Sequence, residues 1–226
     1  MLTQNDRTEL QENLDFIEHL STEQKDYLFE NAANVTYEKG AYLHCNCNKC
    51  VGVLYVKKGE LRVFMLSDEG REITLYHLQE GDLCILSASC VIEAITFDVE
   101  ITAEKNSELI QINSSAFHHL SDANIYVKAF AHELATKRFS SVMWAMQQIL
   151  FMSFDKRLAN FLYQEMTRTN SLTLSMTHEQ IAKNLGSARE VVTRMLKYFA
   201  EEGIVSLSRG KIHILDQEQL YSLTES

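Results

Sequence analysis

Three charged side chains that could read base edges lie close together in the C-terminal third of the chain: Arg189, Glu190 and Arg194. The pattern over residues 177–197 is typical of two short helices joined by a tight turn, and it places all three on one face of the second helix. An arginine can donate two hydrogen bonds to guanine O6 and N7, and a glutamate can accept one from cytosine N4. The arrangement predicts sequence-specific binding in a DNA major groove.

Signals for helix starts and for the turn frame these residues. Residues 177–180 and 187–190 each fit the S/T-x-x-E/Q capping box that begins a helix. Ala182 is small where two helices would cross, and Gly186 can take the positive φ that a tight turn needs. Taken singly, these charged residues would be read as solvated surface or as a cap. The combination of caps, glycine and apolar spacing favours a DNA-reading helix–turn–helix.

Other polar groups around the motif suit phosphates better than bases. They are the hydroxyl of Thr177 and the cations Lys197, Arg209 and Lys211. Contacts to phosphates fix the position of a protein on DNA without reading its sequence. Two of the cations fall in an expected β-hairpin, formed by residues 204–207 and 211–215 around a turn at 208–210.

The formal charge of −10 argues at first against nucleic acid, but it is unevenly distributed. Residues 1–153 contain 12 Lys and Arg against 22 Asp and Glu, whereas residues 154–226 contain 9 of each. Residues 177–211 contain 6 basic and 4 acidic side chains. A weakly basic patch on an acidic body can neutralise phosphates locally, and it should make the affinity strongly dependent on salt.

The elements that must position this motif follow from pattern changes along a chain without proline. Residues 8–34 are expected to be helical, with a capping box at residues 21–24. Short strands with glycine turns follow, and they predict a β-barrel or β-roll. The expected strands are 51–56, 61–66, 73–78, 91–95, 97–103 and 108–112.

A short helix over 114–120 and one long helix over about 124–150 follow the strands. Along the long helix, apolar residues recur in alternating steps of four and three, which is typical of a helix–helix seam and favours a dimer. The expected dimer interface consists of Ala135, Phe139, Val142, Met146 and Ile149. A second stripe of Phe130, Leu134 and Met143 could cover the roll. An ordinary buried helix in a monomer is the alternative. A hinge is expected at 151–155, before an amphipathic helix over 155–166.

The five cysteines include a C-x-C-x-x-C cluster of Cys45, Cys47 and Cys50. Thiolates at this density can hold zinc or an iron–sulfur cluster or act as a redox pair, although the spacing fits no standard zinc pattern. The plainer interpretation is an exposed loop with incidental thiols. Cys84 and Cys90 lie in apolar strands, where buried thiols are expected. His178 and the pair His118–His119 are expected to be surface or capping residues rather than ligands.

Several classes of protein are disfavoured. No apolar run approaches the roughly 18 residues of a membrane span, and the N-terminus lacks the basic and apolar regions of a signal peptide, so a cytoplasmic protein is expected. No nucleophile–base pair, phosphate loop or H-E-x-x-H motif is present, so we do not expect an enzyme.

The order of elements resembles the CRP/FNR family of bacterial transcription regulators. The resemblance rests on 59–63, 70–75 and 81–82 in the strands, and on 177–182, 186–194 and 209–211 in the C-terminal part. It implies an α+β protein in three parts: a double-stranded β-roll effector domain with an N-terminal helix over 1–123, a dimerisation helix and hinge over 124–152, and a winged helix–turn–helix over 153–226. It also implies a homodimer on pseudo-palindromic DNA with TGA-like half-sites. Family members usually activate transcription through RNA polymerase, and some repress it.

The chain departs from the cyclic-nucleotide-binding members of that family. Their Gly-Glu and Arg-Ser or Arg-Thr pairs are missing, and no Lys or Arg occurs from Glu72 to Glu104. A buried phosphate without a cation would be costly to desolvate. We therefore expect a small-molecule effector other than cyclic AMP or cyclic GMP, with its identity and any cofactor left open. The alternative is a redox or metal sensor that uses the cysteine cluster.

Overall fold

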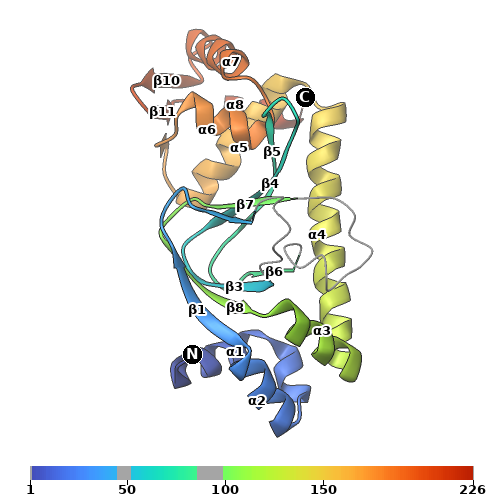
Figure 1. Cartoon of the computed structure of the whole chain (residues 1–226). Coiled ribbons are helices and arrows are strands. Elements are labelled where there is room, and N and C mark those ends of the chain that lie inside the picture. The colour runs from blue at the N-terminus through green and yellow to red at the C-terminus, as the bar shows by residue number, and fades with distance from the viewer. Residues whose placement is uncertain (1, 45–51, 86–98, 226) are drawn as a thin grey trace. The chain divides into compact units, whose positions relative to one another are not determined.

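The computed structural model describes residues 2–44, 52–85 and 99–225 (Figure 1). These residues form two compact units. The first comprises Met1–Met65 and Leu75–Val142, and the second comprises Leu66–Thr74 and Met143–Ser226. Within the described ranges, no helix combines the length and the apolar character needed to cross a membrane.

The first unit begins with three short helical segments where one helical region was expected. They are α1 (Gln4–Asn13), the 3-10 helix η1 (Asp15–His19) and α2 (Thr22–Glu30). The capping box predicted at Ser21 and Gln24 is confirmed, and it begins α2. A second capping box, between Thr3 and Asp6, begins α1. Two helix starts in so short a stretch explain why a single helix does not form.

Two four-stranded sheets make up the predicted β-roll, and every strand pair whose register is described is antiparallel. One sheet has the order β1 (Ala32–Tyr37), β8 (Ser107–Ile112), β3 (Val53–Lys58), β6 (Leu83–Cys84). The other has the order β2 (Tyr42–His44), β7 (Glu100–Ala103), β4 (Leu61–Leu66), β5 (Glu72–Leu78). Residues 91–95, an expected strand, lie outside the described residues.

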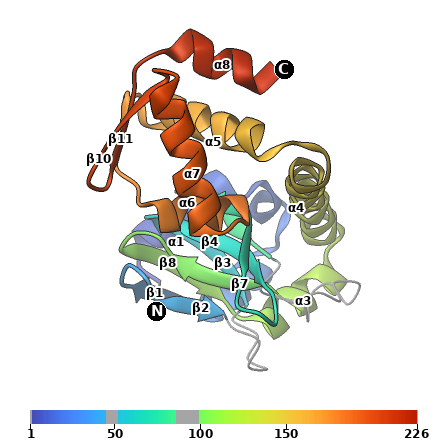
Figure 2. The same ribbon diagram turned by 90° about the horizontal axis from the view of Figure 1, so that it is seen from above.

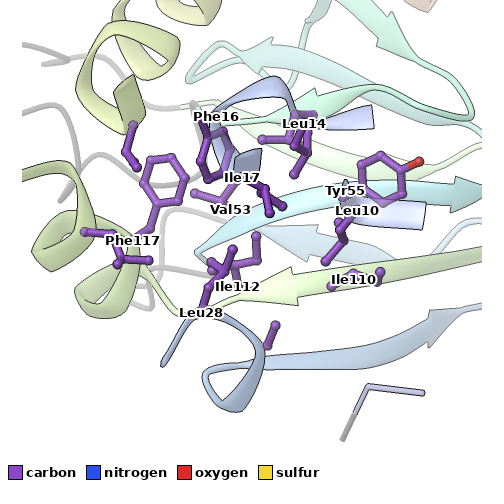
Figure 3. Close-up of a cluster of buried hydrophobic side chains, with 14 of the residues drawn as sticks. Leu10, Leu14, Phe16, Ile17, Leu28, Val53, Tyr55, Ile110, Ile112 and Phe117 are labelled. Carbon is purple, nitrogen blue, oxygen red and sulfur yellow. The ribbon is translucent and has the colours of Figure 1, made fainter. Parts of the chain in front are cut away.

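The sequence of strand β3 is continuously apolar because both faces of the strand are buried. Leu54 and Val56 pack in the interior of the roll, while Val53 and Tyr55 pack on the opposite face, against the N-terminal helices (Figure 3). Alternate side chains of a strand point to opposite faces, so burial on both faces removes the polar alternation. In this second cluster Phe16 meets Phe117 edge to face, with 6.1 Å between ring centroids.

Helix α3 (Ser114–Ala123) is followed by the long helix α4 (Ile125–Phe151), which is uninterrupted as predicted (Figure 1). Phe130 and Leu134 pack on the core of the first unit, as expected. Val142 is partly buried and packs against the interior cluster of the roll, and Met143 is 45% exposed. The assignment of Val142 to a dimer interface stays a prediction.

The second unit contains the C-terminal elements. They are α5 (Phe154–Thr169), β9 (Thr173–Leu174), α6 (His178–Leu185), α7 (Arg189–Glu201), β10 (Val205–Ser208), β11 (Lys211–Ile214) and α8 (Gln217–Glu225). Strand β9, which we did not predict, pairs with β11 and completes a three-stranded sheet. Helices α5, α6, α7 and α8 and the three strands enclose one core, and α7 runs beside β10 (Figure 2).

Candidate nucleic-acid interface

Helix α6 starts and ends as the sequence predicts. The Thr177 hydroxyl accepts a hydrogen bond from the Gln180 N–H at 3.2 Å, and the Gln180 side-chain oxygen accepts one from the Thr177 N–H at 2.8 Å. At the other end Gly186 has φ of 56°, the left-handed conformation that favours glycine. The Ser187 N–H then donates to the Ala182 carbonyl at 2.9 Å, which satisfies an orphan acceptor of the helix end.

The second predicted capping box, between Ser187 and Glu190, was wrong. Helix α7 begins one residue later, with Ala188 as its N-cap, and no side chain among the described residues caps it. The reason is the turn itself, because the backbone of Ser187 belongs to the closing hydrogen bonds of α6. Glu190 is therefore an exposed residue of the first turn of α7 rather than part of a cap.

The exposed face of α7 presents the three predicted base readers. Arg189, Glu190 and Arg194 are all exposed. At about 100° per residue they span an arc of roughly 140° on the helix. A neighbouring face of α7 is fixed in the core by three fully buried side chains, Val192, Leu196 and Phe199. This burial prevents the helix from rotating and keeps the charged arc outside.

A pocket of about 450 Å³ lies between the start of α6, the start of α7 and the turn from β10 to β11. Four of the predicted DNA contacts line it together: Thr177, Arg189, Arg209 and Lys211. The remaining lining residues are Met176, His178, Glu179, Ser208 and Gly210. The structure thus groups Arg189 with the predicted phosphate contacts. Glu190, Arg194 and Lys197 are exposed on α7 but do not line this pocket.

His178 also lines this pocket, although the sequence predicts a surface or capping residue at this position. Its Nδ1 lies 2.9 Å from the Thr193 hydroxyl, and that hydroxyl lies 2.9 Å from the Arg189 carbonyl oxygen. Burial lowers the pKa of the His178 imidazole below its ordinary value, and the Arg189 guanidinium lowers it further. No periodicity links residues 178 and 193, because their contact crosses from one helix to another.

Two further contacts hold the end of α6. Arg157 of α5 donates from Nη1 to the Leu185 carbonyl at 2.9 Å. Lys183 forms an ion pair with Glu72 at 2.8 Å, within the same compact unit. A cation near the C-terminal carbonyls of a helix is favoured by the helix dipole.

Two of the five residues of the predicted dimer stripe on α4 are exposed. Phe139 is 63% exposed and Met146 is 46% exposed, and Ala135 and Ile149 are partly buried. Leu150 and Phe151, which the stripe did not include, are 66% and 80% exposed. So much exposed apolar surface on one helix is typical of an interaction surface.

The predicted sensor cysteines Cys45, Cys47 and Cys50 lie outside the described residues, as does Cys90. Cys84 is fully buried, as expected. Burial raises the pKa of the Tyr76 hydroxyl, and the nearby Cys84 raises it further. Among the described residues, no group of three or more His, Cys, Asp or Glu side chains could hold a metal ion.

The first unit contains a cation that reaches the roll from outside residues 72–104. Arg138 of α4 donates to the Asp82 carboxylate at 3.1 Å and to the Leu83 carbonyl at 3.1 Å. Its guanidinium also lies over the Tyr76 ring, 5.0 Å from the centroid. A cation therefore reaches this part of the roll from a helix more than 50 residues later in the chain.

Two domain families match this chain. The sequence model of the Crp-like helix-turn-helix domain matches residues 156–223, and that of the cyclic nucleotide-binding domain matches residues 34–124. A crystal structure of a protein assigned to the crp/fnr family of transcriptional regulators, from Eubacterium rectale ATCC 33656, is 45% identical. It covers 95% of this chain and 100% of its own, with a TM-score of 0.91.

Curated relatives are more distant. The transcriptional activator protein anr of Pseudomonas aeruginosa is 26% identical over 82% of this chain and 78% of its own length. The cAMP-activated global transcriptional regulator CRP of Pasteurella multocida is 23% identical over 76% of this chain and 84% of its own length.

Proposed function

The chain belongs to the CRP/FNR family of transcription regulators, and we propose that it binds pseudo-palindromic promoter DNA as a homodimer, controlled by an effector sensed in its β-roll. One observation carries the proposal: α7 buries Val192, Leu196 and Phe199 and leaves a charged arc on its exposed face. A helix held in this way can present fixed donors and acceptors to a major groove.

Within this proposal the residues have distinct roles. Arg189, Glu190 and Arg194 read base edges, and Lys197, Arg209, Lys211 and Thr177 contact phosphates. The Thr177 hydroxyl is already engaged in its capping box, so its part is a contact from the helix start rather than from a free hydroxyl. Arg189 lines the same pocket as Arg209 and Lys211, so it can serve a base and a neighbouring phosphate.

The homodimer is proposed to form along α4, through the exposed stripe that includes Phe139 and Met146. Two recognition helices then lie about one turn of DNA apart, which matches a two-fold symmetric site. As in other members of the family, contact with RNA polymerase is proposed to carry the signal to transcription.

The effector is proposed to be neither cyclic AMP nor cyclic GMP. The sequence from Glu72 to Glu104 contains no Lys or Arg, and Arg138, which reaches the roll from α4, is already paired with Asp82. A cyclic phosphate would have to compete with that carboxylate. Titration calorimetry with cyclic AMP tests this, and micromolar binding would overturn it.

The experiment that tests DNA recognition is selection of preferred duplexes from a random pool, followed by measurement of affinity for the enriched site and for random DNA. Enrichment of a TGA-containing dyad is the expected result. Arg189→Ala and Arg194→Ala should each lose about 1–3 kcal/mol on the enriched site and much less on random DNA. Lys128→Ala, an exposed cation on α4, is the matched control. Equal losses on both duplexes would refute base reading.

Repeating the selection with reduced and mildly oxidised protein separates the two kinds of sensor. A change of binding on oxidation, together with iron, zinc or sulfide in anaerobically purified protein, would favour Cys45, Cys47 and Cys50 as the sensor. Unchanged binding would direct the search to small molecules in the roll.

A further inference from the structure

The pocket at the start of α6 places a titratable group among fixed charges. Glu179 faces it from α6, Arg189 from α7, and Arg209 and Lys211 from the turn between β10 and β11. Three of these groups are permanent cations and one is a carboxylate. His178 is the only lining residue whose charge changes near neutral pH.

The hydrogen bonds of Thr193 define which nitrogen of His178 carries the proton. The Thr193 hydroxyl has a single hydrogen, and it lies 2.9 Å from the Arg189 carbonyl oxygen, which can only accept. The hydroxyl therefore donates to that carbonyl and accepts from His178 Nδ1–H at 2.9 Å. In the neutral ring Nε2 is then left with a lone pair, for which the described residues supply no hydrogen-bond partner.

A lone pair on Nε2 cannot bind a phosphate, because phosphodiester oxygens are acceptors only. A protonated ring would keep Nδ1–H on Thr193 and gain an Nε2–H that donates to a phosphate oxygen. In the free protein, burial and the guanidinium of Arg189 oppose that protonation. A phosphate seated in the pocket would reverse the balance, since its charge offsets the surrounding cations.

We propose that His178 is a proton-linked phosphate ligand, which contacts the DNA backbone only as an imidazolium and takes up a proton from solvent when the complex forms. The proposal rests on the proposed DNA-binding function and adds a pH dependence to it. Thr193 acts as the positioning residue, because its hydroxyl holds the His178 ring in the Nδ1–H tautomer. In that tautomer Nε2 must gain a proton before it can donate to a phosphate.

Proton linkage determines the direction in which the DNA affinity changes with pH. Because the pKa of His178 is lowered in the free protein and would be raised in the complex, affinity gained from this contact is full below the free-protein value and is lost as pH rises through the value in the complex. Between the two values the dissociation constant should rise by up to about tenfold per pH unit for each protomer.

The test is isothermal titration calorimetry of the full-length protein with DNA, in buffers of different ionisation enthalpy, together with anisotropy titrations from about pH 5.5 to 8. A random-sequence duplex serves alongside the enriched one, since phosphate contacts are independent of sequence. The wild-type protein should take up close to one proton per protomer on both duplexes.

Three variants complete the design. His178→Gln should abolish the proton uptake and flatten the pH profile. His178→Arg should bind DNA with an affinity that does not depend on pH over this range. His213→Gln is the matched control, because His213 is an exposed histidine on β11 that also bonds a threonine, at 2.9 Å from Thr173, but does not line the pocket. It should behave like the wild type.

The experiment distinguishes a failure of this inference from a failure of the proposed DNA-binding function. Proton uptake that persists in His178→Gln, or that is absent from a wild-type protein which binds DNA, would overturn this inference and leave the proposed function standing. Failure to bind either duplex at any pH would overturn both. Circular dichroism of each variant establishes that the helices remain folded.

Discussion

Arg157 of α5 donates a hydrogen bond across 2.9 Å to the carbonyl oxygen of Leu185, the last residue of α6. The bond joins α5 to the turn of the helix–turn–helix. Carbonyls at the end of a helix lack partners within it, and a guanidinium satisfies one while complementing the helix dipole. The orientation of α6, and of the pocket at its start, therefore depends on a residue outside the recognition motif.

Replacing this guanidinium should weaken both stability and DNA binding. In Arg157→Met the Leu185 carbonyl loses a charged donor, which should cost about 1.5–3 kcal/mol of unfolding free energy. Urea denaturation followed by circular dichroism measures the loss. Lys156→Met, a change of similar size at the neighbouring residue, should remain within about 0.5 kcal/mol of the wild type. Equal losses in the two variants would show that the hydrogen bond contributes nothing specific.

The contribution of Asp6, on helix α1, to the stability of the folded protein should depend on pH. Burial by itself would raise the pKa of Asp6, but hydrogen bonds from Lys57 at 2.5 Å, Thr3 and Asn34 hold that pKa well below its usual range. A carboxyl with a depressed pKa in the folded state stabilises the protein above its unfolded value and loses that contribution as pH falls.

Asp6→Asn should therefore lose about 1.5–3 kcal/mol at pH 7, because a buried charged hydrogen bond is removed. The difference between variant and wild type should begin to shrink below about pH 4, because the unfolded chain binds a proton at Asp6 there while the folded protein still holds the carboxylate. Urea titrations at several pH values measure both effects. Glu12→Gln, an exposed carboxyl on the same helix, is the control. A difference that stays constant from pH 7 to pH 3 would contradict the assignment.

Gly186 should be the costliest glycine to replace in the second unit. An added Cβ would strain its φ of 56° and would approach Ile73 Cγ1 to 3.0 Å. Gly203 has a similar φ of 75°, but its Cβ would meet nothing within 4 Å. Gly203→Ala should cost about 1–2 kcal/mol for the backbone strain alone, and Gly186→Ala about 1 kcal/mol more. Thermal unfolding of the two variants isolates the contact, and equal costs would count against it.

A charge on the exposed stripe of α4 should separate the protomers. Phe139→Glu places a carboxylate in the proposed apolar seam, and desolvating an unpaired charge there is strongly unfavourable. Sedimentation velocity should show a shift from dimer to monomer, with a parallel loss of DNA affinity. Ser140→Glu places the same carboxylate on an adjacent exposed position and should leave the dimer intact. If the Phe139→Glu protein still sediments as a dimer, α4 is not the dimer interface.

The residue pattern was sufficient for the features that depend on neighbours in the chain. The capping box at Thr177, the left-handed glycine at 186 and the uninterrupted α4 all follow from interactions over three or four residues. The same holds for the buried stripe of α7, because a period of 3.6 exposes one face of a helix and buries the other. Local rules also revealed the charged arc of Arg189, Glu190 and Arg194.

Only the tertiary structure decided the contacts between residues far apart in the chain. The pattern at 187–190 fitted a capping box, yet the turn had already used the Ser187 backbone. The contact of Arg138 with Asp82 and the contact of His178 with Thr193 each join two different elements, so no local pattern in the sequence predicts them. The physical reason is that hydrogen bonds and burial depend on distance in space. The sequence alone therefore determined the elements and the charged face, and the fold determined which of those charges share a pocket.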